Sequence, residues 1–232
     1  MAGLDPAIHV DPRDKPGDDE RNDMTEPRTI TLYTDYKSPY AYLAKDPAYA
    51  LARDFGVRLD WRPYVLNIPD FLGSARLDAA GNVIEEQRTA HQWRRVKYSY
   101  MDCRRQAKKR GLTIRGTTKI WDTVLGSCGL LWAKRQGDAV FRAYHDRVFE
   151  RFWKRELDIE DIVVVTAVLQ EAGADTTDFA AYAEDAGPAE VRRISCEAEE
   201  AGVFGVPTFV IGGELFWGSE HLPDIREKLG RE

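Results

Sequence analysis

The spacing of apolar residues at the beginning of the chain changes from that of a strand to that of a helix and back to that of a strand. This order predicts a parallel pair of strands. The run RTITLYT at 28–34 alternates apolar and polar side chains, which is typical of a strand. Residues 41–55 carry apolar side chains at helical spacing and end at Gly56, and VRLDWRPYV at 57–65 alternates again. Strands joined by a helix of this length pair in parallel through a right-handed crossover. The chain therefore opens with a strand–helix–strand unit.

The next 136 residues have almost exclusively helical spacing, and the end of the chain returns to alternation. Helices are expected at about 84–110, 120–131, 140–152, 158–173 with Asp158 as N-cap, 175–186 and 188–201. The segment PTFVIGGELFWG then predicts a hairpin that turns at its two adjacent glycines, followed by a last helix at 219–229.

This order predicts an α/β protein with a thioredoxin-like fold and an inserted all-helical domain. Residues 24–65 and 202–232 are expected to form the thioredoxin-like domain, and residues 66–201 the helical insertion. Residues 1–23 contain seven acidic and three basic residues and little apolar surface, so we expect a disordered tail that is not native to the protein. Met24 is the candidate start.

The composition excludes several classes of function. Without the tail, 30 basic residues face 32 acidic ones, so no global charge indicates a nucleic-acid partner. No apolar run is long enough to span a membrane or to form a signal peptide. Cys103, Cys128 and Cys196 are widely spaced without a C-x-x-C pair, which favours a reducing compartment, the cytoplasm. The four histidines show no metal-ligand spacing, and we expect no metal site.

The segment DYKSPYAYLA at 35–44 starts the first helix at the place where a thioredoxin-like redox protein carries two cysteines. This chain has Ser38 and Ala41 there, which disfavours a disulfide oxidoreductase. Ser38 is a favoured N-cap, and the proline after it is favoured at the first helical position. Ser38 is therefore either a cap alone or the head of an anion site, since free N–H groups and the helix dipole stabilise a thiolate there.

Two later segments face that helix start in a thioredoxin-like topology. In GVFGVPTFV at 202–210, Pro207 directly precedes a strand. A cis bond before it would leave the Val206 backbone available to pair with a peptide, whereas a trans bond would make an ordinary turn. In FWGSEHLPDI at 216–225, Ser219 and Glu220 begin the last helix. They are either helix-capping residues or ligands for an α-amino acid group.

Together, these three segments resemble the family of 2-hydroxychromene-2-carboxylate isomerases and kappa-class glutathione transferases, a DsbA-like branch of the thioredoxin fold. The family motifs read approximately Asp-Phe-x-Ser-Pro-Tyr-x-Tyr-Leu-Ala, Gly-Val-x-Gly-Val-Pro-Thr and Phe-Trp-Gly-x-Asp-Arg-Leu. This chain has DYKSPYAYLA, GVFGVPT and FWGSEHL. The resemblance covers about residues 28–229.

The resemblance implies glutathione as the cofactor and assigns roles to individual residues. Ser38 matches the serine that hydrogen-bonds the glutathione sulfur. Val206, with Pro207, matches the backbone that holds the cysteinyl part. Ser219 and Glu220 match the positions that hold the γ-glutamyl end. Asn82 matches a polar group near the sulfur, and Tyr40 and Lys97 match positions near the substrate.

The resemblance also implies a homodimer and a small aromatic or conjugated acid as substrate. It leaves three functions open: a glutathione-dependent isomerase, a glutathione transferase, and a thioredoxin-like protein that binds peptides without redox activity. Glu220 and His221 replace the usual Asp-Arg pair, and the loop around Asn82 differs from the family pattern. These departures concern the γ-glutamyl end and the acceptor pocket.

A basic run at 88–110 contains nine Lys or Arg residues and one acid, Asp102. Nucleic-acid binding needs such a basic face, but most of these charges are expected on the solvated side of a helix. Lys97 with Arg94 is the pair that we expect to attract a substrate carboxylate.

Overall fold

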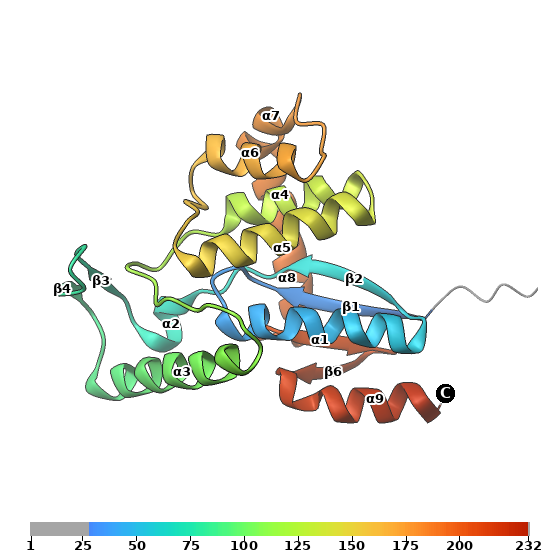
Figure 1. Cartoon of the computed structure of the whole chain (residues 1–232), viewed down its shortest axis with the longest axis horizontal. Helices are drawn as coiled ribbons and strands as arrows, with labels where there is room; N and C mark the ends of the chain where they lie inside the picture. Colours follow the sequence, from blue (N-terminus) through green and yellow to red (C-terminus); the bar gives the residue numbers. More distant parts are fainter. Residues whose placement is uncertain (1–27, 232) are drawn as a thin grey trace, which may run out of the picture.

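The computed structural model describes residues 28–231, and the predicted tail at 1–23 lies outside the described residues. Four strands form one mixed sheet in the order β2-β1-β5-β6 (Figure 1). β1 (Thr29–Thr34) and β2 (Arg58–Pro63) are parallel, whereas β5 (Thr208–Ile211) pairs antiparallel with both β1 and β6 (Glu214–Trp217). The predicted strand–helix–strand unit and the predicted C-terminal hairpin are confirmed.

The helix α1 (Pro39–Phe55) joins β1 to β2 and has the predicted ends. The side chain of Ser38 accepts a hydrogen bond from the Ala41 N–H, and Gly56 takes the left-handed φ of +62° that ends the helix. α1 crosses in front of the sheet and contacts α9 (Leu222–Arg231), while α8 (Ala186–Glu200) runs behind the sheet (Figure 1). The start of α1 therefore lies at the edge where β1 ends.

The insertion divides into two parts on different sides of the α1 start (Figure 1). One part packs its helices on α4 (Val124–Arg135) and contains α5 (Asp138–Lys154), α6 (Ile162–Glu171), α7 (Phe179–Glu184) and α8. The other part contains α2 (Ile68–Leu72), β3 (Ala75–Leu77), β4 (Val83–Glu86) and α3 (Ala90–Lys109). Since α3 contacts α1 and α2, this second part covers the thioredoxin-like unit from its other side.

The prediction of an all-helical insertion is wrong at residues 75–86, which form an antiparallel hairpin. Its turn is closed by Asp78, which accepts hydrogen bonds from the backbone and the side-chain amide of Asn82. The helix predicted from residue 84 begins only at Ala90, because Thr89 and Gln92 form a capping box that fixes its start. Helical spacing within so short an apolar segment does not distinguish strand from helix.

A second correction concerns the start of α6. The N-cap is Asp161, whose carboxylate accepts from the Val163 N–H at 2.8 Å, rather than the predicted Asp158. Asp158 instead accepts from the Glu160 N–H and closes the turn before the helix. Both aspartates satisfy a backbone donor, and only the geometry of the preceding loop decides which of them starts the helix.

An aromatic core connects the helical bundle to the start of α1. Tyr36 is buried between Tyr144 and Phe149, and its hydroxyl lies 3.0 Å from Nδ1 of the buried His145. Gly129 permits this packing, because a Cβ at that position would clash with the Tyr144 hydroxyl. Tyr36 fixes the turn between β1 and α1 and thereby the position of Ser38.

Within residues 28–231, no helix is both long and apolar enough to cross a lipid bilayer. The same residues contain no group of three or more His, Cys, Asp or Glu side chains that could hold a metal ion.

Candidate active site

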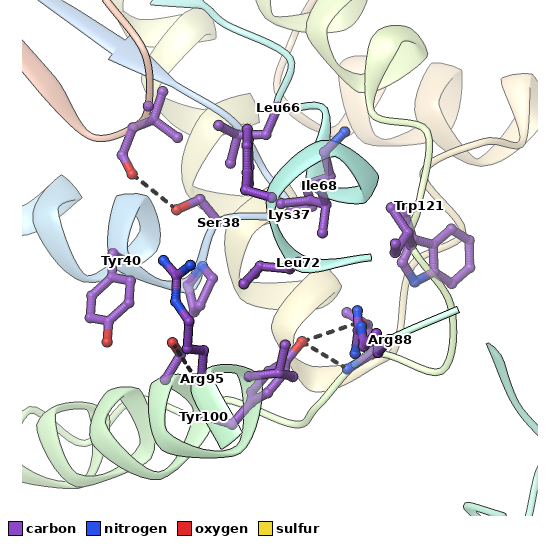
Figure 2. A pocket seen from close by; sticks show the side chains of 18 of the residues that line it. Lys37, Ser38, Tyr40, Leu66, Ile68, Leu72, Arg88, Arg95, Tyr100 and Trp121 are labelled. Atoms are coloured by element: carbon purple, nitrogen blue, oxygen red, sulfur yellow. Dashed lines mark hydrogen bonds between the residues drawn. The ribbon is translucent and has the colours of Figure 1, made fainter. Parts of the chain in front are cut away.

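Ser38 is the N-cap of α1, and its hydroxyl lies between the helix start and the loop before β5. The Oγ atom accepts from the Ala41 N–H at 3.2 Å and lies 3.4 Å from the carbonyl oxygen of Val206, to which it donates (Figure 2). Ser38 is 4% exposed. A hydrogen bond of 3.4 Å is long, so this hydroxyl can turn to a better acceptor that enters the site.

The peptide bond between Val206 and Pro207 is cis, which is the first of the two alternatives that the sequence left open. The Val206 carbonyl receives only the long bond from Ser38, and within the described part of the chain its N–H has no hydrogen-bond partner. Buried backbone groups are normally paired. The Val206 backbone therefore offers one donor and one acceptor to an extended peptide, as in strand addition.

A cavity of about 460 Å³ opens beside Ser38 and is bounded by α1, α2, α3 and the loop before α4 (Figure 2). Its apolar walls are supplied by Leu66, Ile68, Phe71, Leu72, Val96, Ile120, Trp121, Phe204 and Trp217. Four cationic side chains, Lys37, Arg88, Arg95 and Lys119, also line it, and within residues 28–231 no carboxylate does. A mostly apolar pocket with a few cationic groups suits a planar organic anion.

Asp35 organises the turn that presents Ser38, a role that sequence reasoning missed. Its buried carboxylate accepts from the N–H groups of Lys37 and Leu66 and from the Thr123 hydroxyl, at 3.2, 2.8 and 2.6 Å. The Lys37 ammonium lies 3.5 Å from the same carboxylate. Asp35 thus ties together the α1 turn, the segment after β2 and the start of α4. The signal in the sequence was an acidic residue directly after a buried strand.

Tyr40, a predicted substrate residue, lies in the first turn of α1 and lines the cavity. Its hydroxyl donates to Asp102 on α3 at 3.3 Å. Burial, followed by the neighbouring Cys103 and Asp102, raises the pKa of Tyr40 far above its ordinary value. Tyr40 therefore stays protonated and joins α1 to α3 beside the site.

Ser219 and Glu220 lie next to the cis-proline loop but do not line the cavity. The Gly218 N–H donates to the Pro207 carbonyl at 2.9 Å, which brings the turn at 218–220 beside the Val206 backbone. The Glu220 carboxylate folds back over Gly218. His221, in the short turn before α9, contacts Asp224 in the first turn of α9 at 3.1 Å. The predicted γ-glutamyl residues are thus adjacent to the predicted cysteinyl site.

The structure does not bring Asn82 or Lys97 to Ser38. Asn82 is exposed in the turn of the β3–β4 hairpin, where Asp78 binds it. Lys97 lines a neighbouring cavity of about 290 Å³, with its ammonium 5.9 Å from the centre of the Trp93 ring. Arg94 is exposed and lines neither cavity. The roles predicted for Asn82 and Lys97 by resemblance, and for the pair of Lys97 and Arg94 from the basic run, stay predictions.

Sequence reasoning also missed the cations that do line the Ser38 cavity. Arg95 and Arg88 were present in the basic run, but only the packing of α3 shows which of its charges face the cavity. Lys119 lies in the loop before α4 and pairs with Glu160. Lys37 lies inside the Ser38 motif itself, between the aspartate and the serine.

Comparison with known proteins agrees with this architecture. Residues 29–230 match the model of the DSBA-like thioredoxin domain. The chain is 29% identical over 205 residues to a 2-hydroxychromene-2-carboxylate isomerase of Sphingobium xenophagum, covering 87% of this chain and 98% of that protein. It is 26% identical over 208 residues to a protein of the same name from Pseudomonas putida, covering 87% and 94%.

A solved structure of a 2-hydroxychromene-2-carboxylate isomerase superposes with a TM-score of 0.67 at 22% identity, covering 88% of this chain and 95% of that one. At that identity the likeness establishes the fold. Since the family model spans nearly the whole described structure, the chain belongs to the DSBA-like thioredoxin domain family, in which it resembles the 2-hydroxychromene-2-carboxylate isomerases over most of its length.

Proposed function

We propose that this protein is a glutathione-dependent isomerase of the 2-hydroxychromene-2-carboxylate type. The observation that supports the proposal most directly is the position of the Ser38 hydroxyl. It heads α1, donates a long hydrogen bond to the Val206 carbonyl, whose own N–H is unpaired within the described residues, and borders an apolar cavity with cationic groups. The similarity to proteins named 2-hydroxychromene-2-carboxylate isomerase, at 29% and 26% identity over 87% of the chain, supports the reaction class.

The residues present fit glutathione. The Val206 N–H and carbonyl would pair with the cysteinyl backbone, since both lack a good partner among the described residues. Ser219 and the N–H groups of the turn after Gly218 would bind the γ-glutamyl carboxylate, and the Glu220 carboxylate would bind the α-ammonium. Pro207 holds these two parts together through the bond from the Gly218 N–H.

The chain supplies no reactive thiol of its own at this site. Position 41 is a buried alanine, and the nearby Cys103 is fully buried, which raises the pKa of its thiol to about 12. Glutathione, when bound, would supply a thiolate nucleophile for reversible addition to a conjugated double bond, the chemistry that a cis–trans isomerisation needs. Ser38 would donate a hydrogen bond to that sulfur, and the start of α1 would favour its negative charge.

The remaining cavity would hold the conjugated acid on which the thiolate acts. Its apolar walls would accept a planar ring, and the hydrogen bond from Tyr40 to Asp102 joins α1 to α3 beside it. The cationic groups favour a substrate that carries a carboxylate.

The proposal is tested by following the isomerisation of 2-hydroxychromene-2-carboxylate with and without glutathione. We expect turnover only with glutathione, and Ser38→Ala should lower kcat/KM about 10- to 100-fold, the value of a hydrogen bond to a charged group. The matched control is Thr166→Ala, which removes a hydroxyl that also donates to a helical carbonyl, that of Ile162, but lies on α6 and does not line the cavity. Accumulation of a glutathione adduct would instead identify a transferase, and no turnover would overturn both enzymatic functions.

A further inference from the structure

The four cations of the Ser38 cavity differ in whether a carboxylate already neutralises them. Lys37 pairs with the buried Asp35, and Lys119 pairs with Glu160. The Arg95 guanidinium has no ion-pair or hydrogen-bond partner within residues 28–231. The charge of Arg95 is therefore available to a ligand, whereas the two lysines are committed to the protein.

Arg95 is also the cation whose side chain is directed at the reaction centre. It projects from the second turn of α3 across the cavity toward Ser38 (Figure 2). The neighbouring Val96 is buried, and the Ser99 hydroxyl donates to the Arg95 carbonyl at 3.0 Å, so the turn that carries the guanidinium is held in place. A guanidinium binds a planar carboxylate through two parallel hydrogen bonds, and the exposed Arg95 side chain, which has no partner among residues 28–231, is free to take up that geometry.

Arg88 lies just before α3 and lines the same cavity, but its guanidinium is already engaged by protein contacts. Its side chain donates to the Gly73 carbonyl at 3.3 Å and lies over the Trp93 ring, 4.9 Å from its centre. Burial lowers the pKa of Arg88, although an arginine stays charged at physiological pH. Arg88 is thus held by protein contacts, and Arg95 is the better candidate for a ligand.

We propose that Arg95 is the specificity-determining residue of this cavity and binds the carboxylate of a conjugated aromatic acid next to Ser38. The link between this carboxylate site and the reaction rests on the proposed function, whereas binding of the aromatic acid by Arg95 does not. The ring of the acid would lie against Trp121 and Ile120, and its carboxylate would pair with the Arg95 guanidinium. Lys97 and Arg94, the pair that the sequence suggested, lie outside this cavity.

The test measures binding by titration calorimetry in the absence of glutathione, with 2-naphthoate and its neutral counterpart 2-naphthamide as probes. We expect the native protein to bind naphthoate at least about tenfold more tightly than the amide, the discrimination that a charge-assisted hydrogen bond provides. Arg95→Gln should remove this preference, and Arg95→Lys should restore part of it. Arg94→Gln, which changes the adjacent exposed arginine on the same helix, should leave it unchanged.

Equal loss of preference in Arg94→Gln, or an undiminished preference in Arg95→Gln, would overturn the assignment. Failure of the native protein to bind naphthoate would overturn it as well. Glutathione titrated in parallel separates this result from the proposed function. If glutathione binds normally to Arg95→Gln while the naphthoate preference is lost, both proposals hold. If glutathione fails to bind the native protein while naphthoate binds through Arg95, only the proposed function fails.

Discussion

Asp35 is predicted to stabilise the turn that presents Ser38, and Asp35→Asn tests that role with little change in side-chain volume. The Asp35 side chain is completely buried and accepts through both oxygens. Oδ1 accepts from the Lys37 N–H and the Thr123 hydroxyl, and Oδ2 accepts from the Leu66 N–H and faces the Lys37 ammonium. An asparagine keeps only one acceptor oxygen, so its NH₂ group must face two donors.

The expected loss follows from these contacts. Removing one partner of a buried ion pair costs about 3–5 kcal/mol, because the other charge stays buried without compensation. Asparagine still accepts two of the hydrogen bonds, and Lys37 can rotate toward the cavity. We therefore expect a loss at the lower end of this range, a decrease of about 3 kcal/mol in the free energy of unfolding. Since the Ser38 N–H donates to the Asp35 carbonyl at 3.0 Å, the variant should also lower kcat/KM.

Urea unfolding of the two proteins at neutral pH measures the difference, provided that the m-value is unchanged. Asp224→Asn, which changes an exposed aspartate next to His221, is the matched control and should stay within about 0.5 kcal/mol of the native protein. A loss of less than about 1 kcal/mol in Asp35→Asn would refute the account of the turn.

Three further predictions concern other parts of the molecule. In the native protein, a thiol reagent at pH 8 should modify the exposed Cys196 rapidly, but the buried Cys103 and Cys128 only after unfolding. The reason is that burial raises the pKa of both buried thiols to about 12. Equally fast modification of all three thiols would contradict this. Burial, with a nearby lysine, holds the pKa of His145 well below its ordinary 6.5, so the unfolded chain takes up the proton first. As the pH falls below 6.5, the free energy of unfolding should therefore decrease by about 1.4 kcal/mol per pH unit. Urea unfolding of His145→Gln should lack this slope. Gly205→Ala places a Cβ 2.7 Å from an indole nitrogen at the cavity rim and should weaken binding of naphthoate in calorimetry, whereas unchanged binding would show that this rim does not contact the ligand.

The sequence predicted the centre of the candidate site because its signals are local. Ser38 before Pro39 marks a helix start, and Pro207 directly before a strand marks the facing loop. The strand order then brings the two together, since β5 pairs with β1. The alternation and helical spacing of the thioredoxin-like unit gave its elements to within a few residues.

The walls of the cavity depend on packing and could not be predicted in this way. The basic run offers nine cations, and their orientation is set by the buried stripe Val96, Cys103 and Ala107 that packs α3 inward. Arg94 and Arg95 are both exposed, but this packing places only Arg95 at the wall of the cavity. The β3–β4 hairpin was missed because its strands are only three and four residues long, and with it the exposed position of Asn82.

The ionisation of the glutathione thiol in complex with the protein tests the central claim most directly. The ultraviolet absorbance of the thiolate, followed across pH at saturating glutathione, gives the pKa of the bound thiol. With native protein this pKa should lie well below the value of an ordinary thiol, about 8.5, and in Ser38→Ala it should return toward that value. An identical pKa in both proteins would show that the Ser38 hydroxyl does not touch the sulfur and would contradict the account.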